Sequence, residues 1–105
     1  MDVSIFDIQA EFCRAMGSSA RLRILHLLRD QPQTVTEIAR GTGLMQATVS
    51  RHMASLKLVG VVLAQRRGHE IIYRIADPKI GEVCDLVREV LSERLQQHSR
   101  LLIRR

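Results

Sequence analysis

The chain has 105 residues, enough for one domain over 1–105 whose small core would gain stability from burial against a partner. Sixteen Lys and Arg against eleven Asp and Glu give a formal charge of +5, which favours a polyanionic partner such as nucleic acid. No apolar run reaches the roughly eighteen residues of a membrane span, and the acidic N-terminus lacks the pattern of a secretory signal, so we expect a cytoplasmic protein.

Two helices are predicted first in the chain. Apolar side chains share one stripe of the first helix, expected for about residues 4–16: Ile5, Ile8, Phe12 and Met16. Gly17 and the two serines after it break this helix and begin a second one, which ends near Asp30. Leucines at positions three apart are expected on the buried side of the second helix: Leu22, Leu25 and Leu28.

A helix-turn-helix is predicted for the next stretch. Thr34 and Glu37 have the spacing of a capping box, which begins a short third helix over about residues 35–40. Gly41 and Gly43 stop that helix, and a fourth helix follows over about residues 46–58. The buried face of the fourth helix is expected to carry three apolar residues: Val49, Met53 and Leu56.

The residue ahead of the fourth helix is unusual. Met45 occupies the N-cap position, where the oxygen of Ser, Thr, Asp or Asn normally accepts a backbone N–H, and a missing cap destabilises a helix by about 0.5–2 kcal/mol. Thr42, one turn earlier, or a bound phosphate could satisfy these N–H groups instead.

A hairpin and a long helix complete the chain. Two β-rich stretches lie on either side of Arg67, Gly68 and His69, which is a hairpin signal. The last helix is expected from about Lys79 to beyond Gln97, because one set of residues recurs every three or four positions: Ile80, Cys84, Val87, Leu91, Leu95 and His98. The order ααααββα predicts a mainly α fold with a β-hairpin wing, a winged helix-turn-helix of the α+β class.

The outward face of the fourth helix is suited to a DNA major groove. Its side chains are small or can hydrogen-bond base edges: Gln46, Ala47, Thr48, Ser50 and Arg51. His52 is expected to contact phosphate or to shape the helix surface, and Lys57 to contact the DNA backbone. On the hairpin, Arg66, Arg67 and His69 are expected to contact phosphates. The alternative is that the helix pair is only a packing unit with a solvated charged face.

Three stretches of the chain resemble the ArsR/SmtB family of winged-helix bacterial repressors. They are GSSARLRILHLL, TVTEIARGTGLMQATVSRHMASLKLVGVV and RRGHEIIYRI, and the resemblance covers about residues 12–76. It is most specific in TVSRHMASL and at Tyr73. The resemblance implies a homodimer that joins through its first and last helices, binds an imperfect inverted repeat near a promoter, and leaves the DNA when an effector binds.

The metal sites of that family match this chain only in part. VTEIARGTG stands where the family's third-helix site has cysteines. Asp85 and His98 match half of the last-helix zinc site, but Val87 and Leu101 occupy the other two positions. Two ligands per half do not complete the four that zinc prefers, so Asp85 and His98 are weak metal candidates, and no cofactor is required.

The cysteines suggest a different signal. Dithiol sensors of the family pair a cysteine late in the second helix with one in the last helix, but this chain has His26 at the first of these positions. We expect His26 to be a partly buried helix histidine. Cys13 and Cys84 lie on the two helices expected at the dimer interface, and a pair could form if their Cα atoms come within about 7 Å. Either they form a thiol sensor, for oxidants or a soft ion such as As(III), or they are small buried hydrophobes.

Other functions fit the sequence less well. Readers of single-stranded RNA use exposed aromatic side chains, and this chain has one Tyr and two Phe, so no RNA partner is expected. The sequence contains no phosphate-binding glycine loop and no nucleophile elbow, which argues against an enzyme. A winged-helix module that docks onto another protein, without an effector site, remains the alternative to an operator-binding repressor.

Overall fold

The computed structural model describes residues 3–103. Its helices and strands follow one another along the chain as α1 (Ile5–Met16), α2 (Ser19–Leu28), β1 (Gln33–Thr34), α3 (Val35–Thr42), α4 (Gln46–Leu58), β2 (Val62–Arg67), β3 (Glu70–Ile75) and α5 (Pro78–Ile103). The predicted order of helices and hairpin is confirmed, with one strand added between α2 and α3. None of the described helices is long and apolar enough to cross a membrane.

The helix-turn-helix is formed by α3 and α4. The capping box that begins α3 is present in both directions, because Thr34 Oγ1 accepts from the Glu37 backbone N–H and the Glu37 carboxylate accepts from the Thr34 N–H. The helix runs two residues beyond its predicted end, and Gly43 closes it with a φ of 76°. Glycine suits this position because a left-handed conformation strains residues that carry a Cβ.

Three antiparallel strands form one small sheet in the order β1-β3-β2. In the hairpin, Val62 pairs with Ile75 and Arg67 with Glu70, so Gly68 and His69 form the turn between the strands. The strand β1 was not predicted, because the stretch before α3 was interpreted as a turn and a helix cap. It contains two residues, and Gln33 pairs with Tyr73 of β3. A strand this short has no periodicity of its own and depends on the neighbouring strand.

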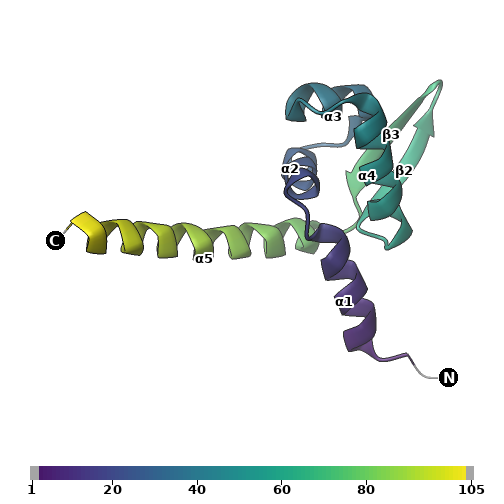
Figure 1. Cartoon of the computed structure of the whole chain (residues 1–105). Helices are drawn as coiled ribbons and strands as arrows, with labels where there is room; N and C mark the ends of the chain where they lie inside the picture. The colour runs from purple at the N-terminus through teal and green to yellow at the C-terminus, as the bar shows by residue number, and fades with distance from the viewer. Residues whose placement is uncertain (1–2, 104–105) are drawn as a thin grey trace.

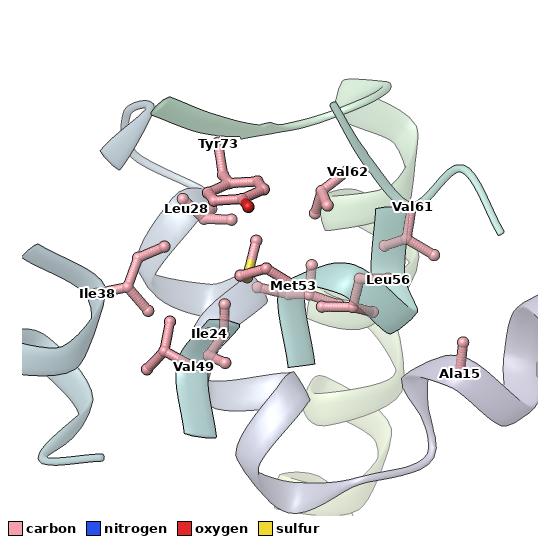
Figure 2. Packing of buried hydrophobic residues seen from close by; sticks show 11 residues of the cluster. Ala15, Ile24, Leu28, Ile38, Val49, Met53, Leu56, Val61, Val62 and Tyr73 are labelled. Carbon is pink, nitrogen blue, oxygen red and sulfur yellow. The ribbon is translucent and has the colours of Figure 1, made fainter. Parts of the chain in front are cut away.

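The core lies between the sheet and α2, α3 and α4 (Figure 2). Val49, Met53 and Leu56 of α4 are completely buried, as predicted. Tyr73 of β3 points into the same core from the sheet (Figure 2). On α2 the prediction is wrong for Leu22, which is 40% exposed, whereas Ile24 is completely buried. Leu22 lies outside the core because it faces surface pockets between α2 and its neighbouring helices.

The last helix, α5, projects away from the rest of the molecule (Figure 1). Its 26 residues give a length of about 39 Å at the rise of an α-helix. The radius of gyration is 16.5 Å, against about 13 Å for a compact chain of this length. Large apolar side chains along α5 are at least half exposed: Val83, Leu86, Val87, Val90, Leu91 and Leu95. Most of this helix is therefore without a packing partner among the described residues.

Candidate nucleic-acid interface

The two faces of α4 differ sharply. One face is buried against the core, and the other presents small or hydrogen-bonding side chains to solvent: Gln46, Ala47, Ser50, Arg51 and Lys57. Thr48 is half-buried, and its hydroxyl accepts a hydrogen bond from the Arg51 guanidinium at 3.4 Å. The face predicted to read DNA is therefore accessible over nearly its whole length, although Thr48 is less exposed than its neighbours.

The start of α4 has no side-chain cap. Met45 has the extended backbone of an N-cap residue, with φ −69° and ψ 146°, but its side chain accepts no hydrogen bond and is 75% exposed. Thr42 does not take over this role. Its hydroxyl donates to the Ile38 carbonyl at 2.7 Å and accepts from the Leu44 N–H at 3.3 Å, which stabilises the turn rather than the first turn of α4.

His52 is turned toward α2. It is half-buried, and its Nδ1 accepts a hydrogen bond from Arg21 Nε at 3.0 Å. The same guanidinium donates from Nη1 to the Ala15 carbonyl at 3.1 Å. Burial lowers the pKa of His52 below its ordinary 6.5, and the positive charges of Arg21 and Arg51 lower it further. The structure places His52 against its own fold, at the edge of the exposed face.

The hairpin carries its basic residues at the tip. Arg66 and Arg67 end β2, His69 lies in the turn, and all three side chains are exposed. In Figure 1 the hairpin extends beyond the helices, on the same side of the molecule as α4. The predicted wing and its three candidate phosphate contacts are thus free for a partner that also contacts α4.

Cys13 and Cys84 lie on the same pocket. Cys13 is exposed, Cys84 is half-buried, and both are free thiols. They line an apolar pocket of about 310 Å³ between α1, α2 and α5, together with the thioether of Met16. Burial raises the pKa of the Cys84 thiol, which leaves less of the reactive thiolate at neutral pH. The folded chain therefore brings the two candidate thiols to one site, with Cys13 the more accessible.

Two arginine side chains of the protein already bind the Asp85 carboxylate. Its carboxylate accepts from Arg29 Nε at 3.0 Å and from Arg88 Nη1 at 3.2 Å, and the Arg29 hydrogen bond is the main reason why the pKa of Asp85 is lowered. His98 lies thirteen residues further along the same helix, a distance of about 20 Å by helical rise. The side chains described for residues 3–99 include no group of three or more metal-ligating residues.

His26 is exposed rather than partly buried, so that prediction is wrong. It lines a surface pocket of about 480 Å³ between α2, α3 and α5. The expectation failed because neighbouring positions on α2, Ile24 and Leu25, form the buried face instead.

Two contributions were missed from sequence. No sequence pattern assigned a role to Arg21, and nothing local pairs it with His52, thirty-one positions away. Arg29 likewise had no predicted role, yet it lies across Gly81 of α5 to reach Asp85. Both contacts join helices far apart in the chain, so no spacing rule within one helix could have found them.

Comparison with known proteins identifies relatives over nearly the whole chain. A family profile described as "Bacterial regulatory protein, arsR family" matches residues 18–63. The uncharacterized HTH-type transcriptional regulator Rv0081 of Mycobacterium tuberculosis is 34% identical over 99 residues, covering 93% of this chain and 87% of that protein. A probable mercury resistance operon repressor of Streptomyces lividans is 32% identical, covering 78% of this chain and 66% of that protein.

Solved structures agree with these relatives. The homodimeric winged helix-turn-helix domain of Mb0332 from Mycobacterium bovis, a possible ArsR-family regulator, is 35% identical and superposes with a TM-score of 0.82, over 90% of this chain and 87% of that one. The crystal structure of M. tuberculosis Rv0081 gives a TM-score of 0.81 at 33% identity, over 93% of this chain and 99% of that one.

Proposed function

Because the chain belongs to the arsR family of bacterial regulatory proteins, we propose that it is a homodimeric repressor that binds an inverted-repeat operator and leaves it when an effector binds. It is a DNA-binding winged helix-turn-helix regulator and not an enzyme. The bacterial chromosome lies in the cytoplasm, and we expect this regulator to act there.

The observation that carries the proposal is the accessible polar face of α4 beside a basic wing tip. A recognition helix reads bases through side chains near its N-terminal end, while other elements contact the backbone. We assign base contacts to the residues near the start of α4: Gln46, Ala47, Thr48, Ser50 and Arg51. We assign phosphate contacts to the basic residues of Lys, Arg and His type around them: Lys57, Arg66, Arg67 and His69.

Dimerisation is supported by the unpartnered apolar side chains of α5 and α1. Ile5, Phe6 and Ile8 of α1 are more than half exposed, like the apolar residues of α5. Contiguous exposed apolar surface of this kind marks an interface. The M. bovis relative is described as homodimeric. We therefore assign both helices to an interface between two copies of the chain.

A thiol signal is our leading proposal for the effector. Cys13 and Cys84 line one pocket between the two helices of the proposed interface, so a change at these sulfurs would act on the dimer. Oxidation would form one disulfide and transfer two electrons and two protons to the oxidant, whereas a soft ion would bind both thiolates. A metal at Asp85 and His98 is the weaker proposal, because it would have to displace Arg29 and Arg88 from the carboxylate.

Selection of bound duplexes from a random pool tests DNA recognition. We expect enrichment of an inverted repeat with half-sites about one helical turn apart, and a binding constant that falls steeply with salt. Equal binding to all duplexes, or none, would contradict the proposal and favour a protein-docking module.

Two matched variants separate base reading from phosphate contact. Gln46→Ala should lose about 1–3 kcal/mol at one base position of each half-site and little elsewhere. Arg66→Ala should weaken binding to all sequences alike and reduce the salt slope by about one per subunit. A loss that is uniform across sequences for Gln46→Ala would remove Gln46 from the base-reading set.

The effector is tested on the same duplex. An oxidant or As(III) should weaken operator binding by the unmodified protein and leave a Cys13→Ser, Cys84→Ser double variant unaffected. The metal alternative at Asp85 and His98 is tested by adding zinc and measuring operator affinity in the same way, with Asp85→Asn as the control variant. If the thiols react and operator affinity does not change, the cysteines are structural.

A further inference from the structure

One guanidinium connects three helices. Arg21, near the start of α2, donates to the Ala15 carbonyl in the last turn of α1 and to Nδ1 of His52 in the middle of α4, at 3.1 and 3.0 Å. Among the side chains of residues 3–99, its bond to His52 is the only hydrogen bond that links α4 to another helix. The group is partly buried, so water competes with these bonds only in part.

Because Arg21 donates this hydrogen bond and His52 accepts it, the bond determines the protonation state of the imidazole. Arginine can only donate, so Nδ1 of His52 must be the unprotonated acceptor and the ring must be neutral, with its proton on Nε2. Protonation of the ring would add an N–H at Nδ1, and this N–H would face the Nε–H of Arg21. The contact would then join two donors and two positive charges, and it would no longer hold.

We propose that Arg21 is a positioning residue which, through neutral His52, sets the orientation of the recognition helix α4 relative to α1. This inference rests on the proposed DNA-binding dimer. In such a dimer the two recognition helices must enter grooves about 34 Å apart, so each one must be held firmly against the helices of the dimer interface. Arg21 provides this connection, because it binds α1 with one nitrogen and α4 with another.

The charges around His52 favour the neutral ring. Arg21 faces it from α2, and Arg51 lies next to it on α4. On α1, Glu11 and Arg14 lie on the same surface pocket as Arg21, so that helix brings one charge of each sign. Burial first, and then the positive charges of Arg21 and Arg51, lower the pKa of His52 from its ordinary 6.5, so the ring gains a second proton only in more acidic solution.

The positioning role predicts a pH dependence opposite to that of a phosphate contact. If His52 bound phosphate as a cation, operator affinity would rise as the pH falls through its pKa. If neutral His52 holds α4 in place, binding requires the proton to leave, and affinity falls as the solution becomes more acidic. The two roles thus differ in sign and not only in size.

The test measures operator affinity from pH 8.0 to 5.0 at constant ionic strength, with the duplex selected above. For the unmodified protein we expect constant affinity above about pH 6.5 and a loss of at least about tenfold at the acidic end. His52→Asn places an acceptor oxygen where Nδ1 lies, so it should retain binding at neutral pH and remove the acidic loss. His52→Gln places its amide further out and should lose about tenfold throughout.

Arg21 has its own conservative variant. Arg21→Lys keeps the positive charge but lacks the two nitrogens that reach α1 and α4 together, so it should also lose about tenfold at neutral pH. His69→Asn, on the wing, should lower affinity but leave the acidic loss in place. This comparison assigns the titration to His52.

Two outcomes would overturn the proposal: affinity that rises or stays level on acidification, or equal pH profiles for His52→Asn and the unmodified protein. Failure to bind any specific duplex at any pH would instead overturn the proposed function. Should a variant unfold, the ¹⁵N chemical shifts of His52 in the unmodified protein still test whether its ring accepts from Arg21. They must show the proton on Nε2 at neutral pH, and a proton on Nδ1 would refute the hydrogen bond between Arg21 and His52.

Discussion

A single residue leaves the start of the DNA-reading helix α4 without a cap. Four helices begin with a side-chain cap, from Ser4, Ser18, Thr34 and Asp77, whereas α4 begins at Met45 without one. The first N–H groups of α4 are thus left to solvent or to a bound phosphate. The sequence predicted this missing cap, and the structure confirms it.

The first prediction concerns this position. Met45→Ser should raise the free energy of unfolding by about 0.5–1 kcal/mol, because the backbone of residue 45 already has the extended conformation from which a serine oxygen can accept an N–H of α4. Thermal and urea unfolding measure the change.

The matched control removes a cap that exists. Thr34→Ala should lower the free energy of unfolding by about 1 kcal/mol, since the Thr34 hydroxyl caps α3. If Met45→Ser leaves stability unchanged while Thr34→Ala reduces it, the open start of α4 carries no energetic penalty.

Between elements, the contact of Arg29 with α5 passes over a glycine. A Cβ at Gly81 would collide with Cδ of Arg29, so any larger residue there would force the Arg29 side chain to shift from its path to Asp85. Arg88 completes the group from the next turn of α5. Asp85, which the sequence offered as a candidate metal ligand, thus takes part in joining α2 to α5.

The second prediction uses the pKa of Asp85. Since the folded protein lowers this pKa from its ordinary 3.8, the ion pairs stabilise the fold above that pH and the stabilisation is lost as the pH falls through the lowered value. Gly81→Ala should displace Arg29 and move the pKa of Asp85 up toward 3.8. Carbon-13 NMR titration of the carboxyl group measures it.

Arg88→Gln is the control for that experiment. It removes the weaker of the two cations, so the pKa of Asp85 should rise less than in Gly81→Ala. An unchanged pKa in Gly81→Ala would mean that Arg29 finds another path to the carboxylate.

In the molecule as a whole, the exposure of the apolar residues of α5 has no explanation in a single copy of the chain. The helix extends far beyond the core that its first turns contact (Figure 1). A small core leaves stability marginal, and a second copy would bury this surface.

The third prediction tests that interface. Leu91→Glu should shift the chain from dimer to monomer, weakening dimerisation by at least about a hundredfold, because a symmetric interface loses two buried leucines. Sedimentation velocity measures the shift, and operator affinity should fall with it.

Ser92→Glu adds the same charge one position along, on the polar side of α5. It should leave the dimer intact. If both variants sediment as the unmodified protein does, α5 is not the interface.

The sequence alone determined the order of helices and hairpin, the capping box of α3, the uncapped start of α4 and the face of α4 that stays exposed. These depend on neighbours within a few positions, where helical periodicity and capping chemistry are strong. The resemblance to the arsR family rests on the same local stretches of sequence.

The contacts between elements could not be predicted from the sequence. In the folded chain β1 pairs with β3, Leu22 and His26 are exposed, His52 accepts a hydrogen bond from Arg21, and Asp85 forms ion pairs with Arg29 and Arg88. The physical reason is that these positions depend on side chains distant in the chain, whose approach is set by packing of the whole core rather than by local spacing.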